Sequence, residues 1–192
     1  MKLSIVLPTI PGREAEVART IEIYEYRTHV PIEWIIERGH DNCGAAWNAG
    51  APKATGEVLH MGADDIEPET DQWLPAALWA FHNGHVPLGY VREDEIGTFG
   101  RDFARVVICR REWWEPVIEQ QYWSDNHFDD LMRAAGHTPE IAEGFDFYHR
   151  KSMVGRDESR MEREREAYRA LREVASEHGS EAGNSASGGT GT

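Results

Sequence analysis

The feature that most constrains the fold is the alternation of short apolar runs with helical patterns at the start of the chain. Three such runs, bounded by turn residues, are predicted strands: 3–7, 32–37 and 57–61. Between the first two, Val17, Ile21 and Tyr24 recur at helical spacing, and 45–56 is predicted to contain a short helix ended by Gly50. This order predicts an α/β fold with a mostly parallel sheet flanked by helices.

The pattern continues more loosely through the rest of the first 155 residues. Predicted helices cover 71–81 and 125–137, and predicted strands cover 86–91 and 104–110. The polar, glycine-containing segment 92–102 is a candidate mobile loop. We therefore expect one catalytic or binding domain over 1–155.

The C-terminal part has a different character. Residues 156–178 form a predicted charged helix whose thin apolar stripe, Met161, Tyr168, Leu171 and Ala175, would pack on the body or on a second copy of the chain. A homo-oligomer through this helix is one possibility. Residues 179–192 contain no apolar side chain larger than alanine and are predicted to be disordered.

Charge and composition exclude several classes of protein. The chain has 192 residues and a net charge of -14, which argues against a general polyanion-binding surface. No apolar run approaches the roughly 18 residues that a membrane span needs, and the first run is too short for a secretory signal. We expect a cytoplasmic protein. Cys43 and Cys109 lack metal-ligand spacing and are interpreted as buried or partly buried thiols.

Two adjacent carboxylates, Asp64 and Asp65, directly follow the third predicted strand. In parallel sheets, the carboxyl ends of the strands form the ligand-binding edge, where Pro8, Thr9 and Glu37 would also lie. Carboxylates in such a crevice can hold a divalent cation against a diphosphate. The alternative is a solvated turn that caps the next helix.

Four segments together resemble the GT-A fold glycosyltransferases, especially the family-2-like members that use nucleotide-diphosphate sugars. They are SIVLPTIPGRE (4–14), CGAAWNAGAPKATGEVLHMGADD (43–65), SDNHFDDLMRAAGH (124–137) and FYHRKS (147–152). The likeness is good over about residues 3 to 70 and thinner beyond. Small, stand-alone transferases of this kind are often encoded by bacteriophages.

The resemblance implies a donor-binding set. Pro8 and Thr9 would line the nucleotide pocket, and Glu37 would replace an aspartate that reads the base. Asn48 and Gly50 would lie near the base and ribose, or else they only terminate a helix. Asp64 would approach the ribose or the metal, whereas Glu37 could also be an ordinary charge at a strand end.

The resemblance also implies a reaction centre. Asp65 would be the main ligand of Mn²⁺ or Mg²⁺, and His149 would complete the metal site unless it is an unrelated histidine. Asp125 would be the general base of an inverting transfer, unless Ser124 or Asp125 simply caps the helix. The chain departs from the family at two positions. Gly62 replaces a frequent carboxylate, which puts metal affinity in doubt, and Ser124 replaces a usual glutamate, which puts the base in doubt.

The expected activity is transfer of a sugar, most simply from a UDP-sugar, to an acceptor hydroxyl. The acceptor, whether a protein, a glycan or a modified nucleobase, is left open. The alternatives are a non-catalytic nucleotide-binding or assembly protein with a decayed site and, third, a nucleotidyltransferase. Four aromatic residues could stack on a sugar or base, or belong to the core: Trp113, Trp114, Tyr122 and Trp123.

Overall fold

The computed structural model describes residues 1–93, 97–99, 106–150 and 157–184. The chain divides into two compact units, Met1–Gly155 and Arg156–Thr192, which are described separately. Most of the candidate loop 92–102 falls outside the described residues. Among the residues described, no helix is long and apolar enough to cross a membrane.

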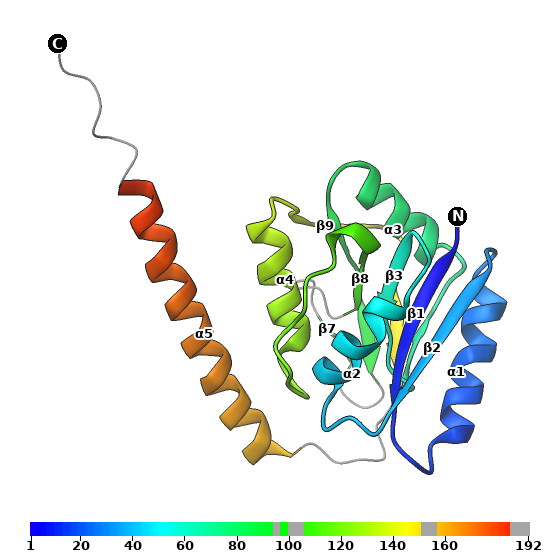
Figure 1. The fold of residues 1–192 in the computed structure, drawn as a ribbon. Coiled ribbons are helices and arrows are strands. Elements are labelled where there is room, and N and C mark those ends of the chain that lie inside the picture. Colours follow the sequence, from blue (N-terminus) through cyan, green and yellow to red (C-terminus); the bar gives the residue numbers. More distant parts are fainter. Residues whose placement is uncertain (94–96, 100–105, 151–156, 185–192) are drawn as a thin grey trace. The chain divides into compact units, whose positions relative to one another are not determined.

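The first half of the body has the predicted alternation of strands and helices (Figure 1). Its elements are β1 (Leu3–Thr9), α1 (Glu14–Arg27), β2 (Ile32–Arg38), α2 (Cys43–Gly50), η1 (Ala51–Lys53) and β3 (Val58–Met61). The rest of the body contains β4 (Ile66–Pro68), α3 (Trp73–His82), β5 (Val86–Leu88), β6 (Val91–Glu93), β7 (Gly97–Phe99), β8 (Val107–Arg110), η2 (Arg111–Trp113), α4 (Ser124–Ala134), β9 (Pro139–Ile141) and β10 (Phe147–His149).

The central sheet is mostly parallel, as predicted, with one antiparallel pair at its edge. Its order is β2-β1-β3-β8, with β1 parallel to both neighbours and β8 antiparallel to β3. Between β3 and β8 the chain makes a long excursion instead of the single helical crossover that joins parallel neighbours, and β8 returns antiparallel to β3.

The excursion builds two small sheets. One has the order β4-β10-β6-β7, and the other pairs β5 with β9. The predicted strand 86–91 is therefore two strands, β5 and β6, that belong to different sheets. Gly89 lies between them and is backed so closely by the carbonyl of Phe145 that a Cβ atom could not fit there.

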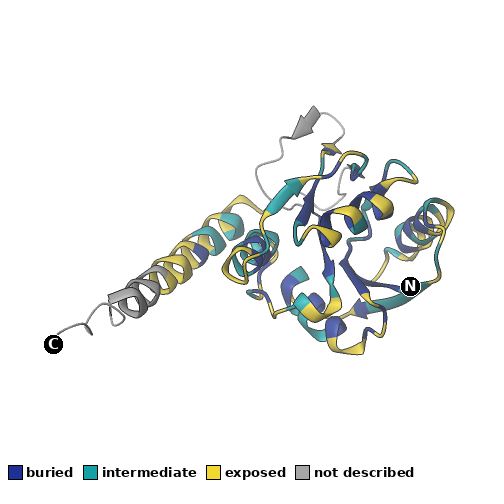
Figure 2. Cartoon of the chain, turned by 90° about the horizontal axis from the view of Figure 1, so that it is seen from above, coloured by how far each residue is buried: buried dark blue, intermediate teal, exposed yellow. Residues whose placement is uncertain are grey.

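Two apolar clusters cover the two faces of the central sheet, because successive side chains of a strand point to opposite faces. On one face, Leu3 and Ile5 pack with side chains of α1, α3 and β10. On the other, Val6 and Leu59 pack with side chains of α2 and α4. Figure 2 shows the buried strands enclosed between half-exposed helices.

The second unit consists of α5 (Glu158–Asn184). The helix is longer than the predicted range 156–178 and includes the first residues of the predicted disordered tail, because each residue added to an existing helix gains a backbone hydrogen bond. Residues 185–192 of that tail lie outside the described residues.

Candidate functional site

The candidate site lies at the carboxyl ends of β1, β2 and β3. In the register of β1 and β2, Pro8 pairs with Glu37 at the end of the sheet. β3 runs parallel to β1, and the amide of Gly62 still donates to the carbonyl of Val6 at 2.9 Å. The chain then leaves the sheet, so Asp64 and Asp65 project beyond its edge.

Asp64 is bound by a side chain from β1 and another from the loop after it. The Thr9 hydroxyl donates to Oδ2 of Asp64 at 2.8 Å. The Arg13 guanidinium donates from Nε to the same oxygen at 2.8 Å and from Nη2 to Oδ1 at 2.7 Å. Its hydrogen bond to Asp64 raises the pKa of Arg13, outweighing the opposite effect of burial. Thr9 and Asp64, predicted from separate motifs, are therefore in contact.

The backbone of the Asp64–Asp65 turn is fixed from two sides. The Thr20 hydroxyl on α1 donates to the carbonyl of Asp64 at 2.9 Å, and Arg150 Nη2 donates to the same oxygen at 2.7 Å. The amide of Arg150 donates to the carbonyl of Asp65 at 2.8 Å. Arg150 also forms an ion pair with the buried Glu67, at 3.2 Å between Nε and Oε2. The two carboxylates are thus presented by a rigid turn.

Asp65 and His149 face each other across this turn. The antiparallel pairing of β10 with β4 places His149 opposite Ile66, and His149 Nε2 lies 3.7 Å from Asp65 Oδ1. Both side chains are partly accessible, at 16% for Asp65 and 28% for His149. No group of three His, Cys, Asp or Glu side chains suited to a metal occurs among the described residues. The pair nevertheless fits a divalent cation that takes its other ligands from a diphosphate and water, since Mn²⁺ accepts carboxylate and imidazole.

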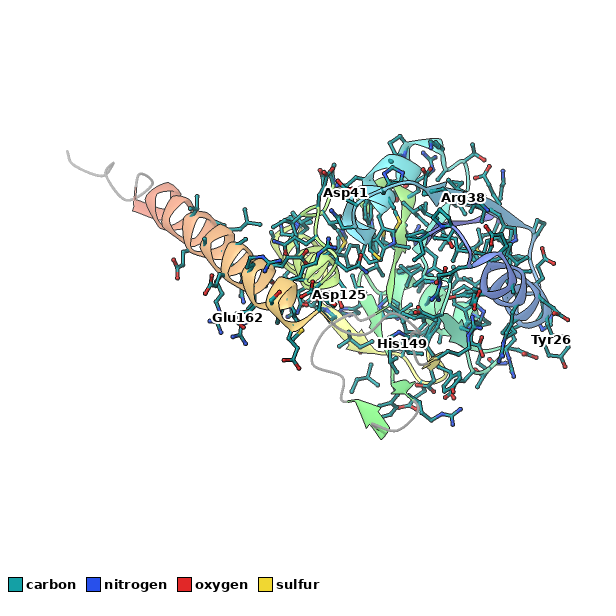
Figure 3. The ribbon with its side chains drawn as sticks, turned by 90° about the horizontal axis from the view of Figure 1, so that it is seen from below. Tyr26, Arg38, Asp41, Asp125, His149 and Glu162 are labelled. Atoms are coloured by element: carbon teal, nitrogen blue, oxygen red, sulfur yellow. The ribbon has the colours of Figure 1, made fainter. Side chains whose placement is uncertain are left out.

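Asp125 lies in the first turn of α4, where its Oδ1 accepts from the amide of Asn126 at 2.9 Å. Burial raises the pKa of the Cys43 thiol to about 11, and the charges of Asp65, Asp64 and Asp125 act in the same direction. Cys43, at the start of α2, thus lies within electrostatic reach of all three carboxylates. Figure 3, which views the body from the carboxyl end of β1, labels Asp125 and His149 on the same side.

Glu37 is a buried carboxylate with a lysine and a histidine beside it. Lys53 Nζ donates to its Oε1 at 2.5 Å, and His40 Nε2 lies 3.0 Å from its Oε2. Burial raises the pKa of Glu37, but the hydrogen bonds with Lys53 and His40 outweigh it and leave the pKa below the ordinary value. Glu37 therefore stays a hydrogen-bond acceptor at neutral pH, as reading a base would require.

Asn48 and Gly50 have structural roles in α2. The Asn48 amide forms two hydrogen bonds with the backbone of Val117, from Nδ2 to the carbonyl at 2.8 Å and from the Val117 amide to Oδ1 at 2.9 Å. A Cβ atom at Gly50 would lie 2.4 Å from Cγ1 of Val6. Gly50 therefore allows α2 to pack directly on β1. Their predicted contacts with the base and ribose stay predictions.

The two departures from the family pattern have local explanations. A Cβ atom at Gly62 would lie 3.3 Å from both Ile5 and Leu7, so a longer side chain here would need both to move. Ser124 is 2% exposed, and its Oγ, with one hydrogen to donate, lies 2.9 Å from the carbonyl of Ile118 and 2.8 Å from that of Gln120, so a glutamate in the same place would have to displace this backbone. Neither Ser124 nor Asp125 is the N-cap of α4, which is Trp123 in a left-handed conformation (φ 70°).

The aromatic residues before α4 divide into two groups. Trp113 stacks on His137 with a centroid distance of 3.8 Å, and Trp114 lies over Phe128 at 6.2 Å, and both are half-buried side chains that pack against the core. Tyr122 and Trp123 are half-buried beside Asp125, and a sugar-stacking role for them stays a prediction.

Sequence reasoning missed Arg13 and Arg150. Arg13 directly precedes α1, where the helix dipole disfavours a cation, and such a misplaced charge indicates a carboxylate partner elsewhere. Arg150 follows the predicted ligand His149, but no pattern in the sequence indicates the backbone oxygen that it binds.

A separate groove of about 650 Å³ lies between α1 and the strands β4, β6 and β10. Tyr26, Arg92 and Tyr148 contribute to its walls, and none of the predicted site residues does. Because side chains alternate along a strand, Tyr148 points away from the face on which its neighbour His149 meets Asp65.

No family model and no curated protein matches the sequence. The fold, in contrast, is similar to those of solved glycosyltransferases of the GT-A type. One is a Drosophila beta-1,4-galactosyltransferase 7 mutant in complex with manganese, UDP-Gal and xylobiose, with a TM-score of 0.54 and 14% identity over 81% of this chain and 68% of the other.

The second solved protein is TarS of S. aureus, with a TM-score of 0.54 and 12% identity over 79% of this chain and 37% of the other. A shorter form of TarS, residues 1–349, gives a TM-score of 0.54 and 11% identity, covering 78% of this chain and 60% of the other. The chain thus spans less than two thirds of either form of TarS. At these identities, the likeness establishes the fold.

Proposed function

We propose that the protein is a metal-dependent glycosyltransferase that moves a sugar from a nucleotide-diphosphate donor, a UDP-sugar in the simplest case, to an acceptor hydroxyl. The observation that carries the proposal is the meeting of Asp65 and His149, 3.7 Å apart, beside the carboxyl edge of a sheet whose fold is similar to glycosyltransferases. The galactosyltransferase of that comparison was crystallised with manganese and UDP-Gal, which fits the same chemistry.

Asp65 and His149 would hold Mn²⁺ or Mg²⁺, which supplies charge stabilisation for the departing diphosphate. Glu37 would accept a hydrogen bond from the base, and Pro8 and Thr9 would line the nucleotide pocket. Asp64, held by Thr9 and Arg13, would face the ribose. Asn48 and Gly50 would act near the nucleotide through the position of α2.

Asp125 is the proposed general base of an inverting transfer. The acceptor oxygen forms a bond to the anomeric carbon and loses its proton to the Asp125 carboxylate. The bond from that carbon to the diphosphate oxygen breaks, and its electron pair leaves with the diphosphate. No covalent intermediate with the protein is needed, so one base and one stabilised leaving group suffice.

The test is hydrolysis and transfer from a panel of nucleotide sugars with Mn²⁺ or Mg²⁺, with calorimetry of UDP binding alongside. We expect Asp65→Asn to lower metal-dependent turnover by at least about a hundred-fold, since a direct ligand is lost. Asp71→Asn, at an exposed aspartate paired with Arg27, is the matched control and should keep full activity. Full activity of Asp65→Asn would refute the metal assignment. Absence of UDP binding with either cation would favour the non-catalytic assembly role.

A further inference from the structure

Arg13 neutralises one of the two neighbouring carboxylates from within the protein. The Arg13 side chain is 11% exposed. Its guanidinium donates hydrogen bonds to both oxygens of Asp64, at 2.7 and 2.8 Å, and lies 3.7 Å from Oδ2 of Asp65. Such a two-pronged contact is a geometry that arginine offers and lysine does not. With Thr9 also bound to Asp64, this carboxylate already accepts three hydrogen bonds, so Asp65 and His149 are better placed than Asp64 to meet a cation.

The charges around the turn do not balance for a metal alone. Asp64 and Asp65 carry two negative charges and Arg13 one positive charge, which leaves a net charge of minus one. The neighbouring Arg150 is paired with Glu67, so these two cancel, and Arg19, which also lies 3.7 Å from Glu67, is 57% exposed and screened by solvent. A dication added to this group would leave an excess positive charge next to the Arg13 guanidinium. A diphosphate that arrives with the dication removes that excess.

We infer that Arg13 is a built-in counter-ion that makes cation binding depend on the nucleotide diphosphate: the site takes the two together and binds the cation alone only weakly. The inference rests on the proposed function, because it needs a diphosphate as the second ligand. Arg13 acts through Asp64 and is therefore a positioning residue. Without it, Asp64 is released to become a cation ligand, and the pair of aspartates alone balances a dication.

The test measures Mn²⁺ binding directly, by the loss of the electron paramagnetic resonance signal of free Mn²⁺, with and without UDP. In the wild-type protein, UDP should strengthen Mn²⁺ binding about ten-fold or more, and Mn²⁺ should strengthen UDP binding by the same factor. For Arg13→Gln, Mn²⁺ binding without UDP should tighten by the order of ten-fold, the scale on which groups around a metal site act. The added substitution Asp64→Asn should abolish that gain.

Arg19→Gln is the matched control, because Arg19 is a more exposed arginine of α1 that lies 3.7 Å from Glu67. It should leave Mn²⁺ binding unchanged. Unchanged or weaker Mn²⁺ binding by a folded Arg13→Gln protein would overturn the inference. If that variant does not fold, equal Mn²⁺ affinity of the wild-type protein with and without bound UDP would overturn it. If UDP does not bind at all, the proposed function fails, whereas the comparison of Arg13→Gln with wild type in Mn²⁺ alone still decides the role of Arg13.

Discussion

Acidification should destabilise the body through one buried histidine, His60 at the centre of β3. Its side chain is fully buried, with Nε2 2.8 Å from the Tyr24 hydroxyl of α1 and Nδ1 3.0 Å from the carbonyl of Val107 in β8. A carbonyl can only accept, so Nδ1 carries the proton and the neutral ring accepts at Nε2 from Tyr24. His60 thereby joins a helix and two strands in its neutral form.

Burial lowers the pKa of His60 from 6.5 to about 4, against the opposite effect of its hydrogen bond to Val107. Between these two pKa values, His60 therefore binds a proton in the unfolded chain but stays neutral in the folded chain. This part of the stability is complete above pH 6.5 and is lost as the pH falls towards 4. At roughly 1.4 kcal/mol for each pKa unit, the loss comes to about 3 kcal/mol.

Urea unfolding followed by tryptophan fluorescence at pH 7, 6, 5 and 4 measures this loss. His60→Gln should be less stable than wild type at pH 7. Between pH 7 and 4, however, the free energy of unfolding of wild type should fall by about 3 kcal/mol more than that of His60→Gln. His29→Gln, at a histidine whose side chain is 73% exposed, should keep the wild-type slope. Equal slopes for wild type and His60→Gln would refute the reasoning.

Two further substitutions test the support of the site. Asn48→Asp removes the hydrogen-bond donor to the Val117 carbonyl and should lower the free energy of unfolding in urea by about 1–3 kcal/mol. A change in UDP affinity at unchanged stability would instead show that Asn48 acts only in binding the nucleotide sugar. Arg150→Gln leaves Glu67 buried without its nearest cation and should cost roughly 3 kcal/mol by the same measurement, and a cost near zero would mean that the Asp64–Asp65 turn is held without Arg150.

The first half of the fold could be predicted because its elements are long enough to show a period. β1 and β2 have seven residues each and are rich in apolar side chains, and α1 repeats Val17 and Tyr24 on its buried face. The strands β4, β9 and β10 have three residues each, too few for any periodic signal, and their pairing is fixed only by contacts distant in sequence. The sequence pattern therefore does not predict how these short strands pair.

The site was predictable where strand ends and short motifs define it, as at Thr9, Asp64 and Asp65. Its internal ion pairs were not, because the partner of a charge depends on how loops fold back. Arg13 is 51 residues from Asp64 in sequence, and the backbone oxygen of Asp64 is 86 residues from the Arg150 guanidinium. The meeting of His149 with Asp65 was implied by the family resemblance and has no basis in local pattern.

The pairing of β4 with β10 has an evolutionary consequence. The same short segment supplies Asp65 and, from Ile66 onward, the strand on which His149 is docked. Inserting a single residue between Asp65 and Ile66 would lengthen the link between this carboxylate and the strand that pairs with β10, and would so move Asp65 away from His149. Related sequences can therefore differ in the length of the loops around the turn, whereas the spacing between Asp65 and Ile66 should be the same in all of them.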